Sequence, residues 1–276
     1  MKGLISGIKR MEIHDGDGLR TTVFFKGCPL KCIWCHNPES ISFERQFAFF
    51  KEKCCGCGGC EKFSKEETQL IVQCCPTEAK TFFGEEYDVR QLADLLAVDK
   101  PFFENGGGVT LSGGECLAQS DFAVALAKEL KENGIGVYID TCGFVKREVF
   151  DRIIPYADKF LYDIKAIDSD AHKTYTGQDN DIILSNLEYL LNRGCDVEIR
   201  YPLVMGYNSS ECEKIGSFLS DKGFKGKIKV LRYHNFSVSR YEALGMECAL
   251  PDTITQDSDV DNAVNILKSY NLNAIK

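Results

Sequence analysis

The apolar positions of the chain follow two different periods, which alternate along most of its length. Short apolar runs of strand length predict six strands, at 21–26, 109–111, 135–139, 159–164, 196–204 and 227–233. Apolar residues at helical spacing predict helices at 89–98, 120–133, 146–154, 182–193, 209–222 and 257–270. Strands that alternate with helices favour an α/β fold with a parallel sheet. The pattern leaves open whether this sheet is doubly wound or curls into a full or partial barrel.

One segment, 47–86, breaks this alternation. It carries six cysteines, the closely spaced Gly56, Gly58 and Gly59, and many charges without a clear helical or strand period. Its apolar content is too small for an independent core, which is the situation in which a bound metal centre stabilises a small domain. We therefore expect a minidomain at 47–86, inserted into one core domain that spans 1–276.

The charge balance excludes some classes of partner. The 276 residues are enough to bury a sizeable core, and 33 Lys and Arg against 41 Asp and Glu give a net charge of −8. Such a balance argues against broad nucleic-acid or anionic-membrane binding. The first twenty residues are interrupted by charges, and no apolar run approaches the ~18 residues of a membrane span. We expect a cytoplasmic, monomeric protein with no nucleic-acid or membrane partner.

The unusual feature of the composition is its 14 cysteines. Cytosolic thiols stay reduced, so clustered cysteines there indicate metal binding rather than disulfides. Nine of them lie between Cys28 and Cys75 in two dense groups, which predicts two sites. The isolated ones are expected to be small buried hydrophobic residues; these are Cys116, Cys142, Cys195, Cys212 and Cys248.

The first group, Cys28, Cys32 and Cys35, directly follows the first predicted strand. The carboxyl ends of parallel strands are where α/β folds place their chemistry. Three thiolates on one loop suit an iron–sulfur cluster that keeps one iron open for a substrate. The alternative is a zinc site, for which the adjacent His36 is the available fourth ligand.

The CxxxCxxC spacing of these cysteines resembles the signature of the radical S-adenosylmethionine enzymes. Within that superfamily, the chain resembles the glycyl-radical enzyme activating enzymes over nearly its whole length outside the insert. The motifs that carry the resemblance are DGDGLR at 15–20, FKGC at 25–28, CHNP at 35–38, GGGVTLSGGE at 106–115, DTCG at 140–143, DIK at 163–165, RY at 200–201 and YH at 233–234. Two positions depart from the family pattern, since Asp17 and Cys116 stand where the family commonly has proline.

The resemblance implies a partial (β/α)6 TIM-like barrel with a ferredoxin-like insert. It implies that one electron from a [4Fe–4S] cluster on Cys28, Cys32 and Cys35, the catalytic cysteines, cleaves S-adenosylmethionine. The resulting 5′-deoxyadenosyl radical would abstract the α-hydrogen of a glycine in a partner glycyl-radical enzyme. A flavodoxin or a ferredoxin would supply the electron. Which glycyl-radical enzyme is the partner is not marked by any motif.

The resemblance also implies residues that bind S-adenosylmethionine. Gly113 and Gly114 would let the backbone approach the methionyl group, where a side chain would clash. Asp140 would receive the ammonium group, while Asp163 and Lys165 would serve the methionyl and ribose side. The full set of implied contacts is Gly113, Gly114, Glu115, Asp140, Asp163, Lys165, Arg200 and His234.

Three further expectations concern residues around this set. Arg200 and His234 would reach the carboxylate and the ribose edge of the cofactor from the far side. The family pattern also allows a monovalent cation, held by Asp140, Thr141, Asp163 and the backbone near Leu161. His14 and His172 have no such place and are expected at the surface or in packing.

The second cysteine group predicts one auxiliary cluster. Cys54, Cys57 and Cys60 form CxxCxxC, and Cys75 precedes a proline as in ferredoxin-type loops. Six cysteines cannot supply the eight ligands of two clusters, so we expect one [4Fe–4S] cluster on Cys54, Cys57, Cys60 and Cys75. Cys74 competes for the fourth place and Cys55 is spare. A zinc site on the same residues is the alternative, and the cluster could relay electrons or be structural.

Two other functions remain open from the sequence. One is a radical S-adenosylmethionine enzyme that modifies a small molecule or a peptide; RNA is disfavoured by the charge. The other is an iron–sulfur electron-transfer protein. A simple ferredoxin would have no reason to possess Gly113, Gly114, Asp140 and Asp163 in this arrangement.

Overall fold

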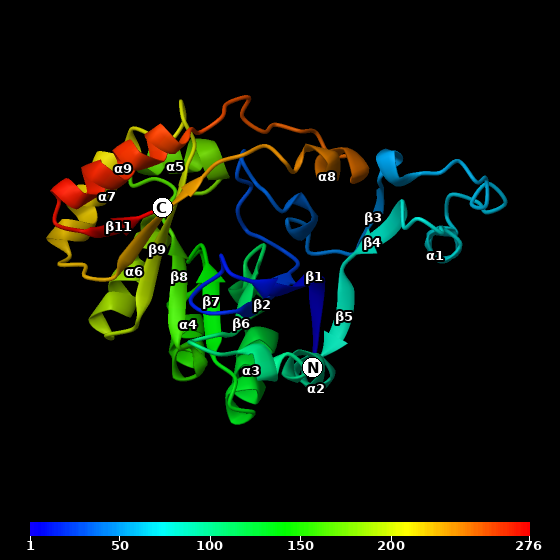
Figure 1. Cartoon of the computed structure of the whole chain (residues 1–276), viewed down its shortest axis with the longest axis horizontal. Helices are drawn as coiled ribbons and strands as arrows, with labels where there is room; N and C mark the ends of the chain where they lie inside the picture. Colours follow the sequence, from blue (N-terminus) through cyan, green and yellow to red (C-terminus); the bar gives the residue numbers. More distant parts are fainter.

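The fold is built on one large sheet, and the computed structural model describes all of residues 1–276 (Figure 1). The sheet has nine strands in the order β11-β10-β9-β8-β7-β6-β2-β1-β5. Six of them confirm the predicted strands: β2 (Arg20–Phe25), β6 (Gly108–Gly113), β7 (Val137–Thr141), β8 (Lys159–Asp163), β9 (Val197–Leu203) and β10 (Lys227–Arg232). The three that were not predicted lie at the two ends of the order: β1 (Lys2–Glu12), β5 (Glu85–Asp88) and β11 (Asn273–Ile275).

The strands from β2 to β11 pair in parallel, whereas β1 is antiparallel to both β2 and β5. The prediction of a mostly parallel α/β sheet is confirmed. The strand order does not return on itself, because β5 and β11 are its two edges. The sheet is therefore open, which decides against a closed barrel.

Helices pack against the sheet and bury a single large core. The predicted helices are present as α2 (Val89–Ala97), α3 (Ser120–Glu132), α4 (Arg147–Ile153), α6 (Asp181–Asn192), α7 (Glu211–Asp221) and α9 (Asp257–Ser269). Three short helices were not predicted: α1 (Thr68–Gln73), α5 (Ser169–Thr176) and α8 (Val238–Ala243). The main apolar cluster holds 42 buried residues from strands and helices along the whole chain, so one core supports the sheet. None of these helices is long and apolar enough to span a membrane.

The cysteine-rich segment projects from the side of the sheet (Figure 1). Its base is a two-stranded antiparallel sheet of β3 (Gln46–Phe49) and β4 (Lys80–Phe83), and α1 (Thr68–Gln73) is its only α-helix. Ala48 and Phe50 form a small apolar cluster with Ala243 of α8. The insert thus contributes little core of its own and rests on α8.

The loop between β1 and β2 crosses the amino ends of the parallel strands. Arg20 is fully buried there, and its guanidinium lies 3.5 Å from the centroid of the Tyr138 ring. It donates hydrogen bonds to Thr110 Oγ1 at 2.7 Å and to the carbonyl oxygens of Gly106 and Val109 at 2.7 and 2.8 Å. These bonds tie the start of β2 to the start of β6.

Asp17 joins three more strands at the same end. Its carboxylate accepts hydrogen bonds from Lys159, the first residue of β8, and from Tyr138 Oη of β7 at 3.2 Å. Lys227, the first residue of β10, lies 3.3 Å away. Asp17, which replaces the proline common in the resembled family, therefore has a structural role. Its hydrogen bonds and ion pairs connect the amino ends of three strands of the open sheet.

We expect this contribution of Asp17 to depend on pH. The hydrogen bond from Lys159 lowers the pKa of Asp17 from 3.8 to about 2. A carboxylate with a depressed pKa stabilises the fold fully above its unfolded pKa, and this stabilisation is lost as pH falls from about 4 towards 2. In urea unfolding followed by circular dichroism, Asp17→Asn should be less stable than the parent at pH 6, and the difference should shrink below pH 4.

Asp94→Asn is the matched control, since Asp94 is exposed on α2. If the difference in the free energy of unfolding between the parent and Asp17→Asn stayed constant down to pH 2.5, this would contradict the ion-pair role of Asp17.

Candidate functional site

The carboxyl ends of the central strands bring the first cysteine group and the predicted cofactor residues to one edge of the sheet. Cys28, Cys32 and Cys35 lie on the loop that follows β2. Burial raises the pKa of Cys32 to about 12, so its thiolate needs a compensating positive charge such as iron supplies. The sulfurs do not converge as the ligands of a single ion would. By its donor type and its place on one loop, this set fits an iron–sulfur cluster.

Helix α8 holds the far end of the cysteine loop. Ser237 Oγ and Tyr241 Oη donate hydrogen bonds to the Cys35 carbonyl oxygen at 3.3 and 3.2 Å. Arg240 donates to the His36 carbonyl oxygen at 3.1 Å and to Glu39 Oε1 at 2.8 Å. No motif in the sequence marks these contacts, although the spacing of three and four residues from the N-cap Ser237 to Arg240 and Tyr241 puts the three donors on one side of the helix.

The two glycines at the end of β6, Gly113 and Gly114, pack against backbone. A Cβ atom at Gly113 would lie 2.2 Å from Phe25 N, and one at Gly114 would lie 2.4 Å from the Ser40 carbonyl oxygen. Gly113 also has a φ of +114°, which side-chain-bearing residues rarely adopt. The space that a side chain would need is therefore taken by the backbone at the end of β2 and by Gly27 and Ser40, on either side of the cysteines. This adds a packing reason to the expected one.

Glu115 is fully buried behind these glycines. Its carboxylate accepts hydrogen bonds from Leu117 N at 3.0 Å, Cys142 N at 2.8 Å and Thr141 Oγ1 at 2.9 Å. Burial raises its pKa, while these hydrogen bonds oppose the rise. Both carboxylate oxygens are thus used within the protein, in joining the end of β6 to the end of β7.

Asp140 of β7 and Arg200 of β9 form an ion pair. Ser112 Oγ donates to Asp140 Oδ2 at 2.6 Å, and Arg200 Nη1 lies 3.6 Å from the same oxygen. Burial raises the pKa of Asp140 to about 7, against the opposing effect of Arg200. Arg200 also pairs with Asp15 at 3.5 Å, a contact that the sequence analysis did not predict. The Nε atom of Arg200 is buried without a hydrogen-bond partner, so one donor remains for a ligand.

Asp163, the last residue of β8, forms an ion pair with Lys165. Lys165 Nζ lies 2.6 Å from Asp163 Oδ2, and the lysine side chain is only 10% exposed. A pair of opposite charges at this edge is suited to a zwitterionic ligand, because the carboxylate can bind the ligand's cation and the ammonium can bind its anion.

Aromatic rings stack beside the cysteine loop. The rings of His36 and His234 are parallel within 7° at 4.2 Å, and Phe236 stacks on the other side of His234 at 4.4 Å. Burial lowers the pKa of His36 to about 4, so this ring is neutral at pH 7. His36 Nε2 and His234 Nδ1 are buried without partners. The faces of these rings are occupied by one another, so the two unpaired ring nitrogens are the groups that remain for a ligand.

The other histidines lie outside this edge. His14 is exposed, and its carbonyl oxygen accepts a hydrogen bond from Arg200 at 3.0 Å. His172 is buried, with Nδ1 2.7 Å from the Gln178 carbonyl oxygen. Both positions agree with a surface or packing role.

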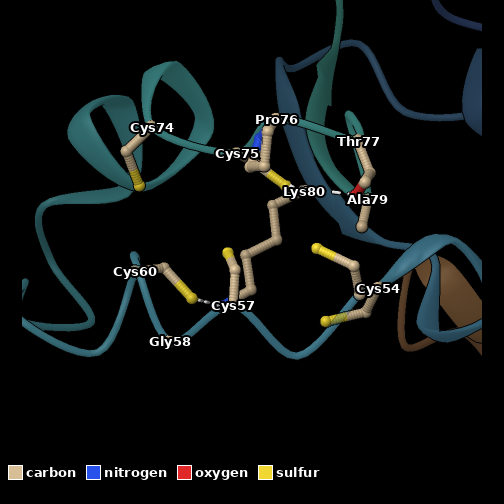
Figure 2. Close-up of a pocket in the computed structure, with 11 residues that line it drawn as sticks. Cys54, Cys57, Gly58, Cys60, Cys74, Cys75, Pro76, Thr77, Ala79 and Lys80 are labelled. Carbon is tan, nitrogen blue, oxygen red and sulfur yellow. Dashed lines mark hydrogen bonds between the residues drawn. The ribbon is translucent and has the colours of Figure 1, made fainter.

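The second cysteine group surrounds a separate hollow in the insert (Figure 2). The Cys74 thiol donates a hydrogen bond to the Ile71 carbonyl oxygen at 3.2 Å, at the end of α1. Backbone hydrogen bonds, the first from Lys80, lower the pKa of Cys75. Lys80 points into the hollow, a feature that the sequence analysis missed. The cysteines that line it are Cys54, Cys55, Cys57, Cys60, Cys74 and Cys75.

The isolated cysteines only partly follow the expectation. Cys116, Cys142 and Cys212 are buried, as expected of small apolar residues. Cys195 is half-buried. The prediction is wrong for Cys248, which is exposed in the loop after α8, where no strand or helix covers it.

Comparison with known proteins matches the chain to one superfamily model and to two activating enzymes. The model of the Radical SAM superfamily matches residues 22–219. The trans-4-hydroxy-L-proline dehydratase activating enzyme of Clostridioides difficile is 40% identical, with 88% of each chain covered. The choline trimethylamine-lyase activating enzyme of Oleidesulfovibrio alaskensis is 38% identical, with 98% of this chain and 96% of the relative covered.

A solved structure supports the same relationship. A domain of pyruvate-formate lyase-activating enzyme from Bacteroides vulgatus is 26% identical, with a TM-score of 0.52. The match covers 62% of this chain and 98% of that domain.

The hydrogen bonds of α8 lead to a prediction about the cysteine loop. Arg240→Met removes a cation that holds His36 and Glu39, so it should lower the free energy of unfolding by about 1–3 kcal/mol. It should also lower the iron bound per chain after anaerobic reconstitution. Denaturant unfolding and iron analysis measure these effects.

Arg232→Met serves as the control, because Arg232 pairs only with the exposed Asp257. Equal losses of stability and of bound iron in Arg240→Met and Arg232→Met would argue against a specific role for α8.

Proposed function

The chain belongs to the glycyl-radical enzyme activating enzymes of the Radical SAM superfamily, and from this premise we propose how its residues divide the work of the reaction. The protein activates a glycyl-radical enzyme. When bound, a [4Fe–4S] cluster supplies one electron that cleaves S-adenosylmethionine, and the 5′-deoxyadenosyl radical removes a glycine α-hydrogen from the partner. The observation that carries this conclusion is the identity of 38–40% to two activating enzymes over most of each chain.

Cys28, Cys32 and Cys35 would hold the cluster that cleaves S-adenosylmethionine. Their placement on one loop at the carboxyl edge supports this role. Arg240, Ser237 and Tyr241 support it indirectly, because they fix the backbone on which Cys35 sits. A fixed loop keeps the open iron in one position relative to the rest of the edge.

The charged residues at this edge would orient the methionyl part of S-adenosylmethionine. Asp140 would accept the ammonium group, and the unpaired Nε of Arg200 would donate to the carboxylate. Asp163 and Lys165 would serve the methionyl and ribose side. Gly113 and Gly114 offer backbone there, because no side chain stands between them and the cysteine loop.

The rings beside the cysteine loop would hold the adenosyl part. His234 Nδ1 is free to bind a ribose hydroxyl, and His36 Nε2 offers a second unpaired ring nitrogen beside it. Glu115 was expected to contact S-adenosylmethionine, but both of its carboxylate oxygens accept hydrogen bonds from the protein. We assign it a positioning role, in which it fixes the ends of β6 and β7.

A monovalent cation would lie against the carboxylates of Asp140 and Asp163, close to the cofactor's carboxylate. The Thr141 hydroxyl donates to Glu115 and accepts from Gly143 N at 3.0 Å, so it has little capacity left for the cation. The carboxylates and the backbone near Leu161 would therefore be its main ligands.

The insert would hold one auxiliary [4Fe–4S] cluster on Cys54, Cys57, Cys60 and Cys75. Cys75 is favoured over Cys74, because backbone donors stabilise its thiolate whereas the Cys74 thiol donates to Ile71. The contact of the insert with α8, which also holds Cys35, supports a relay of electrons to the first cluster. A flavodoxin or a ferredoxin would be the donor.

Reconstitution tests the assignment of both clusters. The anaerobically reconstituted protein should contain about eight irons per chain and form 5′-deoxyadenosine after reduction with dithionite in the presence of S-adenosylmethionine. Cys32→Ala should lose this cleavage and keep about four irons, whereas Cys57→Ala should lose the other four. Iron analysis and chromatography of 5′-deoxyadenosine provide the measurements.

Cys195→Ala, a change away from both groups, is the control and should keep full iron and cleavage. Absence of cleavage at full iron content would contradict the proposed roles of the three catalytic cysteines.

A further inference from the structure

Lys80 places a positive charge inside the hollow of the insert. Its Nζ donates a hydrogen bond to Cys60 Sγ at 2.8 Å (Figure 2). The other residues around the hollow are cysteines and uncharged residues, so Lys80 supplies the only fixed cation there. No carboxylate shares this contact, and the ammonium is balanced by sulfur alone.

The small sheet of the insert determines where this ammonium lies. Lys80 is the first residue of β4 and pairs in register with Phe49 of β3. Its Nζ lies 5.2 Å from the centroid of the Phe49 ring. The preceding residue, Ala79, is fully buried, and its carbonyl oxygen accepts a hydrogen bond from Phe50 N at 2.7 Å. The backbone is therefore fixed at Lys80, and the side chain extends along Phe49 towards the sulfurs.

A cation at this place changes the energetics of electron uptake. Reduction of a [4Fe–4S] cluster adds one negative charge, and hydrogen bonds and positive charges at the ligand sulfurs stabilise that charge. The contact is with Cys60, one of the four proposed ligands, so the charge acts directly on the cluster's ligand shell.

We propose that Lys80 is a positioning residue that raises the reduction potential of the auxiliary cluster by stabilising its reduced state. This inference rests on the proposed function of the insert. In the step concerned, the donor loses one electron, the cluster gains it, and Lys80 keeps its proton. The insert is thereby a better acceptor for the electron of a small donor protein than it would be without the lysine.

The test isolates the auxiliary cluster in the full-length chain. Cys28→Ala, Cys32→Ala and Cys35→Ala together remove the other cluster, so the remaining electron paramagnetic resonance signal comes from the insert. In a potentiometric titration, Lys80→Met should shift the midpoint to a more negative value. A tenfold loss in the equilibrium constant for reduction would correspond to about 59 mV.

Two further variants separate charge from shape. Lys80→Arg keeps the cation and should stay near the parent potential. Lys62→Met removes an exposed lysine of the insert that does not line the hollow, and it should not shift the potential. If Lys80→Met fails to hold iron, Lys80→Gln keeps a hydrogen-bond donor without the charge and carries the same expectation.

The outcomes of the two proposals are distinguishable. If the triple cysteine variant binds no iron, the auxiliary cluster itself is wrong. If it binds about four irons and neither Lys80→Met nor Lys80→Gln shifts the potential, the cluster stands and the role of Lys80 is overturned. Equal shifts in Lys80→Arg and Lys80→Met would overturn it as well, because charge would then not be the cause.

Discussion

The buried carboxylate of Glu115 is the contact on which the carboxyl edge of the sheet depends. A buried charge is tolerated only when hydrogen bonds replace its hydration, and this one receives them from Leu117, Thr141 and Cys142. Its own backbone N donates to the Gly27 carbonyl oxygen at 2.9 Å, in the segment that leads into the cysteine loop. One residue therefore holds the ends of β2, β6 and β7 in a common arrangement. The cysteines that follow the first of these strands and Asp140 of the third are brought to the same edge through it.

Helix α8, in the C-terminal third of the chain, connects the insert to the cysteine loop. Helix α8 contacts the apolar base of the insert through Ala243, and it contacts the cysteine loop through Ser237, Arg240 and Tyr241. Two cysteine groups that are separate in sequence are thus attached to the same short helix. A change in the insert can reach the cysteine loop through rigid contacts over one helix, without passing through the main core.

The sequence predicted the six central strands and the main helices because these carry long, regular apolar patterns. It missed β5 and β11, which have only four and three residues, and β1, of whose 11 residues only Gly3 and Ile5 are buried. It also missed α8, whose six residues are stabilised by contacts with the cysteine loop rather than by their own pattern. Among site residues, cysteines and motif carboxylates were recognisable by residue type and spacing. The stacking of His36, the burial of Glu115 and the direction of Lys80 depend on tertiary packing, so no local pattern reveals them.

The ion pairs of Asp17 at the amino ends of the strands have a consequence for how this architecture can diversify. An open sheet has no ring of hydrogen bonds to maintain its curvature, and here carboxylate–ammonium contacts between β8, β10 and the loop before β2 restrain it at one end. The cysteines proposed to hold the first cluster lie at the opposite end. Loops at that end can be lengthened, shortened or exchanged without changing the contacts that set the spread of the strands. Evolution can therefore reshape the opening for partners of different size while the scaffold stays the same.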